Sequence, residues 1–422
     1  MPRTPRLLGP ALALMLAAAS LTGCSPSGTS AAEAPRITVM ANTTDEVPVN
    51  SVVAAFRRQN PDTHVTVTLA DTDTLQKELP RKLRAGEGPD VFTVWPGSGN
   101  PASVTALEED DLLEELSSRR FNLTMPMGVK PVTDVDGGTY AVPVTFSAIG
   151  AIYSQQALEA VGGTAPTTWT ELLALCDTAR RHGKVLFALG NETPWVTQLV
   201  TYALVATTVY AHLPDFDRQV GYGERTFARS GWRAALDKYL EMDEHGCFNP
   251  APLNTTYEEA VDQVASGRAV GVVQVAGALS AIRAQAPGLD LRMTALPATD
   301  DPDETRMPGA VSAAYGLNPA SRHRRAALAF IDFLGSEQGQ NLYNRTGATL
   351  PAIPNPSFTT DPAVKEVAER QKAGTTVPFM DQQWPDPAVQ QAHFAQIRAL
   401  FAGTTDVDGA LSALDRAYRE HR

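Results

Sequence analysis

The N-terminal third of the chain alternates short apolar runs with segments in which apolar residues recur at helical spacing. Residues 37–41, 65–69 and 91–95 are rich in Val, Ile, Leu, Phe and Thr and predict strands, the last of them buried on both faces. Residues 49–56 and 75–83 place their apolar side chains three or four positions apart and predict helices. Strand and helix in alternation require parallel crossovers. This region therefore predicts an α/β lobe that binds ligands beyond the carboxyl ends of its strands.

The same pattern recurs later in the chain. Residues 140–144 and 148–153 predict two extended segments, and residues 327–334 predict a helix with one apolar stripe. Thr168 is followed three positions later by Glu171, which predicts a capping box at the start of another helix. A chain of 422 residues is too long for one hydrophobic core, so we expect two α/β domains.

The N-terminus has the layout of a secretory signal. Arg3 and Arg6 precede an apolar run at residues 7–19 that is too short to span a bilayer as a permanent helix. Residues 21–24, Leu-Thr-Gly-Cys, resemble a bacterial lipobox, in which the cysteine is acylated and becomes the first residue of the mature protein. The alternative is an ordinary signal peptide that happens to contain Cys24.

The lipobox interpretation defines the first segments of the chain. Residues 1–23 are expected to be a removed lipoprotein signal peptide, and residues 24–35 a flexible tether. No other apolar stretch approaches the ~18 residues that a membrane span needs. We therefore expect a protein held by lipid on the extracellular face of a bacterial cell membrane.

The charge and the cysteines narrow the possibilities further. Loss of the leader changes the net charge from −12 to −14, which argues against a nucleic-acid partner. Cys176 and Cys247 remain after acylation of Cys24, and a disulfide between them is the preferred interpretation for an oxidising compartment. Two buried free thiols are the alternative. Two cysteines without neighbouring histidines make a poor zinc site, so we expect no metal.

Three stretches together resemble one protein family. Residues 86–91 read Gly-Glu-Gly-Pro-Asp-Val, residues 151–158 with 166–173 contain Ala-Ile-Tyr-Ser and Pro-Thr-Thr-Trp, and residues 321–340 end in Phe-Leu-Gly-Ser-Glu-Gln-Gly-Gln. In this order they resemble the extracellular solute-binding proteins of ABC importers, specifically the maltose-binding-like sugar group.

The resemblance implies a two-lobed periplasmic-binding-protein fold of the type II kind, with a cleft between the lobes and a hinge of several segments. The expected crossings between lobes lie near residues 144–147, 308–312 and 348–351. The expected first lobe comprises residues 36–144 plus 311–348, and the second comprises residues 146–308 plus 351–422.

The resemblance also implies a function. The protein would be a monomeric binding component that captures a small solute, most simply a mono- or short oligosaccharide, and delivers it to a membrane permease without a cofactor. A secreted, lipid-anchored glycoside hydrolase and a binder of a non-sugar solute are the alternatives. No Gly-x-Ser-x-Gly or His-Glu-x-x-His motif occurs. The 47 acidic residues are numerous enough to supply the pair of catalytic carboxylates that a glycoside hydrolase needs, but no motif places such a pair.

Sugar sites combine aromatic plates with polar groups, which selects candidate ligand contacts. Trp169 and Trp232 lie in predicted helices and are expected to be structural, whereas Trp95, Trp195 and Trp384 lie in loops that face the cleft in the family. The expected ligand-binding residues are Asn42, Thr43, Asp45, Trp95, Ser98, Ser147, Glu192, Trp195, Gly277 and Trp384.

Asp45 and the loop at residues 277–280 depart from a simple sugar-binding pattern. Asp45 could instead cap the helix that follows it. Residues 277–280, Gly-Ala-Leu-Ser, have no aromatic ring where family members often carry one. A site that lacks this plate is less suited to a long malto-oligosaccharide.

Overall fold

The computed structural model describes residues 35–421, as a single compact unit that begins at Pro35. Cys24 and the predicted signal peptide lie outside the described residues. Within the described part of the chain, no helix is long and apolar enough to cross a membrane. No group of three or more His, Cys, Asp or Glu side chains there is placed to hold a metal ion.

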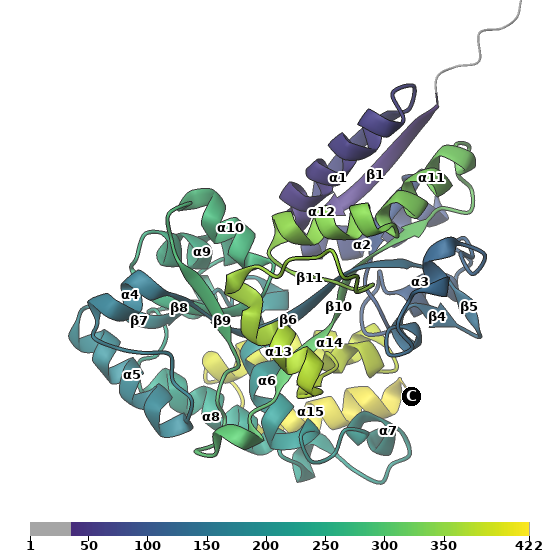
Figure 1. Cartoon of the computed structure of the whole chain (residues 1–422). Coiled ribbons are helices and arrows are strands. Elements are labelled where there is room, and N and C mark those ends of the chain that lie inside the picture. Colours follow the sequence, from purple (N-terminus) through teal and green to yellow (C-terminus); the bar gives the residue numbers. More distant parts are fainter. Residues whose placement is uncertain (1–34, 422) are drawn as a thin grey trace, which may run out of the picture. The chain divides into compact units, whose positions relative to one another are not determined.

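One large mixed sheet runs through the unit, with the path β2-β1-β3-β10-β6-β8-β7 (Figure 1). Its strands are β1 Arg36–Asn42, β2 His64–Ala70, β3 Val91–Val94, β6 Val142–Ser154, β7 Val185–Ala188, β8 Ala269–Val275, β9 Leu291–Thr294, β10 Met307–Leu317, β11 Leu350–Pro351 and β12 Thr376–Val377. The strand β1 pairs in parallel with β2 and β3, which confirms the crossovers predicted from the alternation of strand and helix. A separate hairpin joins β4 Asp134–Val135 to β5 Gly138–Thr139.

The long strands β6 and β10 connect the two ends of the sheet. They pair antiparallel from Ala148 and Gly309 to Val142 and Tyr315. Beyond Ala148, β6 leaves β10 and pairs instead with β8 and β9. The two extended segments predicted at 140–144 and 148–153 are therefore one continuous strand, because a change of partners, and not a break in the chain, separates them.

The segments expected to cross between lobes lie side by side in this central region. Ser147 on β6 pairs with Ala310 on β10, and Phe146 pairs with Leu350 on β11. A register shift interrupts β10 between Val311 and Ala314. A bulge of this kind bends a strand and re-aims its side chains, which is consistent with a sheet that curls at its centre.

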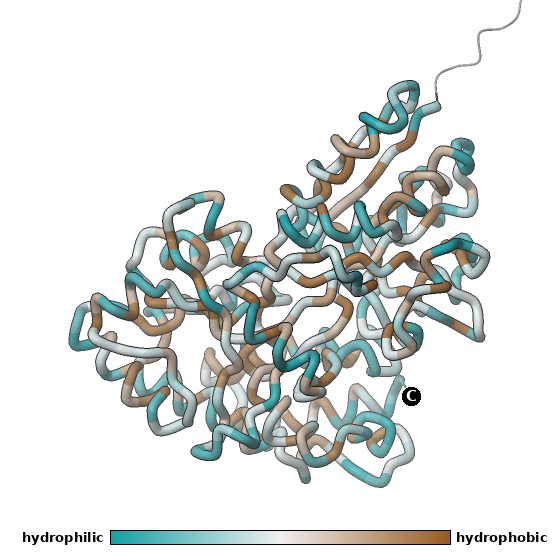
Figure 2. The backbone as a smooth tube through the Cα atoms, in the orientation of Figure 1, coloured by the Kyte–Doolittle hydropathy of each residue, from teal (hydrophilic) through white to brown (hydrophobic). Residues whose placement is uncertain are grey.

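Helices cover the sheet at both ends. They are α1 Glu46–Gln59, α2 Thr72–Arg84, α3 Val104–Glu108, α4 Gln155–Ala160, α5 Trp169–Arg181, α6 Gln198–Val205, α7 Phe216–Gly221, α8 Trp232–Glu244, α9 Tyr257–Ala265, α10 Ala278–Gln285, α11 Arg324–Leu334, α12 Glu337–Gly347, α13 Lys365–Ala373, α14 Pro387–Phe401 and α15 Val407–Glu420. The predicted capping box is present at α5, where Thr168 and Glu171 cap each other's backbone. Figure 2 shows hydrophobic and hydrophilic stretches alternating along the helices, as expected where only one side is buried.

The buried apolar residues form separate clusters rather than one continuous core. Two clusters draw on residues 37–144 and 311–353, and pack α1, α2, α11 and α12 against the first strands. A larger cluster draws on residues 148–310 and 363–418, together with Ala348 and Leu350. Chain segments far apart in sequence therefore build each end of the sheet.

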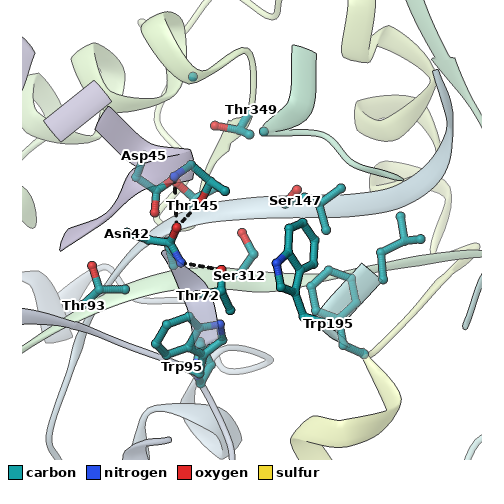
Figure 3. Close-up of a pocket in the computed structure, with 18 of the residues that line it drawn as sticks. Asn42, Asp45, Thr72, Thr93, Trp95, Thr145, Ser147, Trp195, Ser312 and Thr349 are labelled. Atoms are coloured by element: carbon teal, nitrogen blue, oxygen red, sulfur yellow. Dashed lines mark hydrogen bonds between the residues drawn. The ribbon is translucent and has the colours of Figure 1, made fainter. Parts of the chain in front are cut away.

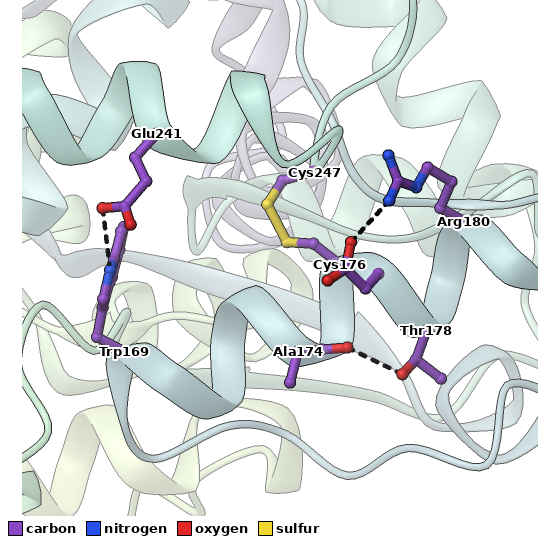
Figure 4. Close-up of a disulfide and its surroundings, with 8 residues drawn as sticks. Trp169, Ala174, Cys176, Thr178, Arg180, Glu241 and Cys247 are labelled. Carbon is purple, nitrogen blue, oxygen red and sulfur yellow. Dashed lines mark hydrogen bonds and ion pairs between the residues drawn. A yellow bond between two sulfur atoms is a disulfide. The ribbon is translucent and has the colours of Figure 1, made fainter.

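A disulfide joins Cys176 on α5 to Cys247, which follows α8 (Figure 4). This is the pairing preferred from the sequence. The bond spans a separation of 71 residues. On the loop-entropy model it could contribute ~4 kcal/mol by restricting the unfolded chain. Nearby, the Trp169 Nε1 donates to Glu241 Oε2 over 3.2 Å, a second link between α5 and α8.

Candidate ligand-binding cavity

A cavity of about 140 Å³ lies where the first strands, the central strands and α6 meet (Figure 3). Its wall is contributed by segments from both ends of the sheet: β1 and β3 on one side, α6 and the segment 379–390 on the other, and β6 and β10 between them. A chamber of this size is comparable to the engineered ~150 Å³ cavity that holds one benzene ring. It therefore suits a single ring-sized group.

The first wall is built at the carboxyl ends of parallel strands, as expected for an open α/β sheet. Asn42 ends β1 and Trp95 follows β3, and both line the cavity. The Asn42 side chain accepts a hydrogen bond from the Thr44 nitrogen at 2.9 Å and donates to Thr72 Oγ1 at 2.8 Å. Asn42 therefore holds this edge of the sheet together. The Trp95 ring is half-buried and offers a flat apolar face.

Asp45 lies in the same wall, at the start of α1. It occupies the cap position of α1 but its side chain makes no capping hydrogen bond. Removal of the carboxylate from water raises the pKa of Asp45 to about 6, although a hydrogen bond with Tyr343 favours the charged form. The carboxylate thus faces the cavity instead of capping the helix.

The opposite wall carries a second aromatic plate. Trp195 lies in the 3-10 turn Pro194–Thr197 that leads into α6, and its ring lies 5.1 Å from that of Tyr257. It is half-buried, and Gln198 and Tyr202 on α6 continue the same wall. Trp95 and Trp195 thus offer apolar ring faces from two different parts of the fold.

The floor consists of hydroxyl groups on the central strands. Thr145 and Ser147 on β6 line the cavity together with Ser312 at the bulge of β10 (Figure 3). The hydroxyls of Thr145 and Ser147 are buried and have no hydrogen-bond partner among the described residues. A buried hydroxyl without a partner carries a desolvation cost, which a polar ligand can remove.

The segment 379–382 forms part of the cavity wall and packs closely against residues 95–100, the loop that follows β3 and is called here the Trp95 loop. A Cβ on Gly97 would meet the Gln382 backbone at 2.3 Å, and one on Gly99 would meet the Asp381 carbonyl oxygen at 2.0 Å. Only glycine permits this approach. Asp381 accepts a hydrogen bond from Gln390 Nε2 at 3.0 Å, and burial raises the pKa of Asp381 to about 6.

The structure brings most of the sequence-predicted residues to this cavity. Those that line it are Asn42, Asp45, Trp95, Ser147, Trp195 and Gly277. Thr43 and Glu192 are exposed and do not line it. Ser98 also lies outside it, because its hydroxyl donates to the backbone oxygen of Trp384.

The expectation of ligand contact at Trp384 is wrong. The ring is completely buried behind the cavity, where its Nε1 donates to Asp217 Oδ1 at 3.1 Å. It packs among the rings of Tyr202, Trp232 and His393. The loop position of Trp384 suggested a surface ring, but the side chain turns inward and joins the core.

Several cavity residues were missed from the sequence. Asp381 and Gln382 lie three and two positions before Trp384, so the sequence pointed to the correct loop but to the wrong side chain within it. Ser312 and Thr349 lie in the predicted crossing segments, where a polar residue in an otherwise apolar run was an available signal. The cavity residues Tyr202 and Gln390 lie on helices and gave no such signal.

Comparison with known proteins identifies the family. The model of the bacterial extracellular solute-binding protein family matches residues 41–341. The chain belongs to this family. The match spans most of the described chain. It includes the cavity residues from Asn42 to Ala313 and ends before the segment 379–390.

Relatives and solved structures agree with this assignment. A multiple sugar-binding protein of Streptococcus mutans is 19% identical, over 76% of this chain and 77% of its own length. An ABC transporter extracellular-binding protein of Pyrococcus horikoshii is 22% identical, over 82% of this chain and 77% of its own length. The solved structure of a solute-binding protein in complex with raffinose has a TM-score of 0.77 at 18% identity, covering 92% of this chain and 99% of that one.

These comparisons establish the general class of the protein. Its fold is the two-lobed α/β fold of solute-binding proteins, as predicted. Its relatives include a sugar-binding protein and an extracellular-binding protein of an ABC transporter.

Proposed function

We propose that this family member captures a small sugar outside the cell, in the cavity between Trp95 and Trp195, and delivers it unchanged to an ABC permease. The observation that carries the proposal is the combination of two half-buried indole rings with unpaired hydroxyls on the strands between them. Sugars present C–H faces that stack on aromatic rings, and hydroxyls that need polar partners. The cavity volume favours a monosaccharide or the end of a short oligosaccharide.

The proposed lobes follow the predicted boundaries, residues 36–144 plus 311–348 and residues 146–308 plus 351–422. The division of the apolar clusters supports the first two boundaries, since the clusters exchange near Val144 and Ala310. Near the third boundary the clusters interleave, with Leu350 in the larger cluster and Ile353 in the other. The pairing of β6, β10 and β11 at the same points supports a hinge there. Contacts made by the solute to both lobes would favour the closed arrangement.

A panel of mono- and short oligosaccharides in a thermal-shift assay tests the proposal. A sugar present at 100 times its dissociation constant should stabilise the purified mature protein by ~2.7 kcal/mol. Absence of any shift across the panel would overturn the assignment of a sugar and favour the alternative of a non-sugar solute.

The same panel tests the enzyme alternative. Asp45 and Asp381 both line the cavity with raised pKa values, and a paired set of carboxylates is what a glycoside hydrolase requires. We expect every oligosaccharide to be recovered intact after prolonged incubation. Hydrolysis of any panel member by homogeneous protein, abolished in Asp45→Asn or Asp381→Asn, would refute a binding-only function.

The anchor is the second element of the proposal. We propose that Cys24 is acylated and that residues 24–35 tether the protein to the outer face of the cell membrane; the lipobox-like residues 21–24 support this. Cys24→Ser should release the protein from washed membranes and abolish incorporation of labelled fatty acid. Membrane retention with undiminished labelling would contradict the lipobox.

A further inference from the structure

The side chains that line the cavity carry negative charge without a balancing positive charge. Asp45 and Asp381 are the charged residues of the wall within residues 35–421, and no Lys, Arg or His of that range lines the cavity. Neither carboxylate takes part in an ion pair with a described residue. Each is bonded to neutral groups, Tyr343 beside Asp45, and Tyr202 and Gln390 beside Asp381. If the two lobes closed over a neutral solute, both carboxylates would lose their contact with water, and no positive charge would compensate for this loss of solvation.

Hydrogen-bond acceptors are also in excess around Asp381. Gln382 donates its side-chain nitrogen to the Val311 carbonyl oxygen at 2.7 Å. Gln390 donates its side-chain nitrogen to Asp381 Oδ2 at 3.0 Å and to Gln198 Oε1 at 3.2 Å. The side-chain oxygens of both glutamines are buried and accept no hydrogen bond from any described residue.

These contacts fix the orientation of both amides. Turning the Gln382 amide over would bring its oxygen against the Val311 carbonyl oxygen, and turning the Gln390 amide over would bring its oxygen against the Asp381 carboxylate. Both alternatives place acceptor against acceptor. The wall near Asp381 therefore presents a carboxylate and two amide oxygens. The donors beside Asp381, the Gln390 amide and the Tyr202 hydroxyl, leave both amide oxygens without a partner.

We propose that the solute carries a protonated amine, and that Asp381 with the side-chain oxygens of Gln382 and Gln390 receives this ammonium group. The inference rests on the proposed sugar-binding function and narrows its substrate class to amino sugars or aminated polyols. An ammonium has three donors and no acceptor, which matches the deficit of the wall. Asp45, on the opposite lobe, adds a second negative charge to the same cavity.

Two further features support a cationic ligand. The net charge of −12 for the whole chain creates a field that attracts cations and repels anions. Burial keeps the pKa values of Asp45 and Asp381 above the ordinary carboxyl range, as expected for carboxylates that have no cationic partner among the described residues. Sugar phosphates and uronic acids find no positive partner in the described wall.

Matched pairs of sugars test the inference. Isothermal titration at neutral pH would compare glucosamine with glucose, galactosamine with galactose and mannosamine with mannose, with the N-acetylated forms and glucuronate as further arms. For the pair of best-fitting stereochemistry, we expect the amine to bind at least about tenfold more tightly than the hydroxyl, the size expected for one charged hydrogen bond. Acetylation should remove the advantage, and glucuronate should not bind.

A pair of charge-matched variants locates the effect. Asp381→Asn keeps the size of the side chain, and should reduce the preference for the amine over the neutral sugar to within about twofold. Glu192→Gln removes one carboxylate from an exposed position outside the cavity wall, and should retain the full preference. Circular dichroism and thermal unfolding of both variants would establish that they fold.

The outcomes separate this inference from the proposed function. Neutral sugars that bind as tightly as their amines, or an amine preference that survives Asp381→Asn, would overturn the amine site and leave sugar binding intact. Absence of binding by every amine and every neutral sugar would overturn both.

Discussion

Two pairs of tryptophans in this protein lie close to the same cavity and behave differently. Trp95 and Trp195 are half-buried and form its aromatic walls. Trp232 and Trp384 lie behind it, completely buried, with ring centroids 6.2 Å apart and His393 within 6.0 Å of each. The rings of the half-buried pair are partly accessible to a ligand, whereas the rings of the buried pair are completely covered by other protein atoms.

A tryptophan in a loop can stack on a ligand only where other side chains leave the face of its ring uncovered. Trp384 and Trp195 occupy similar local positions. Trp195 lies within a 3-10 turn that leads into α6, and Trp384 directly follows a 3-10 turn that precedes α14. Asp217 distinguishes them. This buried carboxylate accepts from Trp384 Nε1 and from the Tyr210 hydroxyl, and so holds the ring of Trp384 inside the core.

Trp384→Ala should have the largest effect and should act on folding. Removal of a fully buried ring leaves a cavity and deprives Asp217 of a donor, so we expect the free energy of unfolding to fall by ~3–5 kcal/mol. Urea denaturation of the mature protein measures it. A variant of undiminished stability that fails to bind ligand would return Trp384 to the binding site.

Trp195→Ala should have the reverse effect, weakening ligand binding more than folding. We expect a loss of ~1–3 kcal/mol in binding free energy, because the ring is an aromatic anchor, and a smaller loss in stability, because the ring is partly solvated already. Trp232→Ala is the matched control and should destabilise the fold while affinity stays nearly intact. Unchanged affinity in Trp195→Ala would remove this residue from the site and weaken the case for a sugar.

Asp217→Asn should change how stability depends on pH. Burial raises the pKa of Asp217 from 3.8 to about 7. Between these values the folded state holds a proton that the unfolded chain has released, so a fall in pH favours folding through this group, by at most about 1.4 kcal/mol per pH unit. The asparagine variant should lose that contribution.

The free energy of unfolding is measured for wild type and for Asp217→Asn at several pH values between 7 and 4, and the two proteins are compared at each pH. Other groups contribute to both proteins and cancel in the difference. Asp45 and Asp381 act in the same direction as Asp217, whereas burial lowers the pKa of His393 to about 3 and costs stability as pH falls below 6.5. A difference that is constant with pH would show that Asp217 is ionised in the core.

Ser147→Ala should have the smallest effect and should act on affinity alone. The Ser147 hydroxyl is buried and unpaired among the described residues, so its removal should leave stability unchanged or slightly higher. Ligand affinity should fall by ~0.5–1.5 kcal/mol if the solute uses this hydroxyl. The ligand for this titration is the tightest binder of the sugar panel.

Ser154 offers a control on the same strand. Its hydroxyl accepts from the Ala157 nitrogen at 3.2 Å and caps α4. Ser154→Ala should therefore lower stability by ~0.5–2 kcal/mol and leave affinity unchanged. Equal affinity losses in the two variants would mean that Ser147 acts through the strand and not through the ligand.

The local pattern of the sequence predicted much of the fold correctly. Strands β1, β2 and β3 and helices α1 and α2 follow the predicted runs within a few residues, because their periodicity reflects burial of one face. The capping box at Thr168 and Glu171 is a contact within one turn of the chain, so it too is readable from adjacent residues. The sequence also predicted that Asn42 and Trp95 lie at one site, and both line the cavity, because parallel strands place their carboxyl ends together.

The remainder of the site depended on contacts between distant segments. Tyr202 and Gln390 reach the cavity from α6 and α14, two helices whose sequences look like ordinary packing surfaces. Asp381 faces the cavity because Gly97 and Gly99 let the Trp95 loop approach the segment 379–382. No local pattern reports such an approach between residues nearly 300 positions apart.

By itself, the sequence determined which helices and strands form, that the first strands are parallel, and that this chain resembles a solute-binding family. These features depend on periodicity, caps and short motifs, which are set by residues close together in the chain. Only the tertiary structure decided which of the loop tryptophans keeps an open face and which carboxylates share a cavity without a cation. Whether a ring lines a cavity or belongs to the core depends on what packs against it. Two of the residues that hold Trp384 in the core, Asp217 and Tyr202, lie more than 160 residues away from it in the chain.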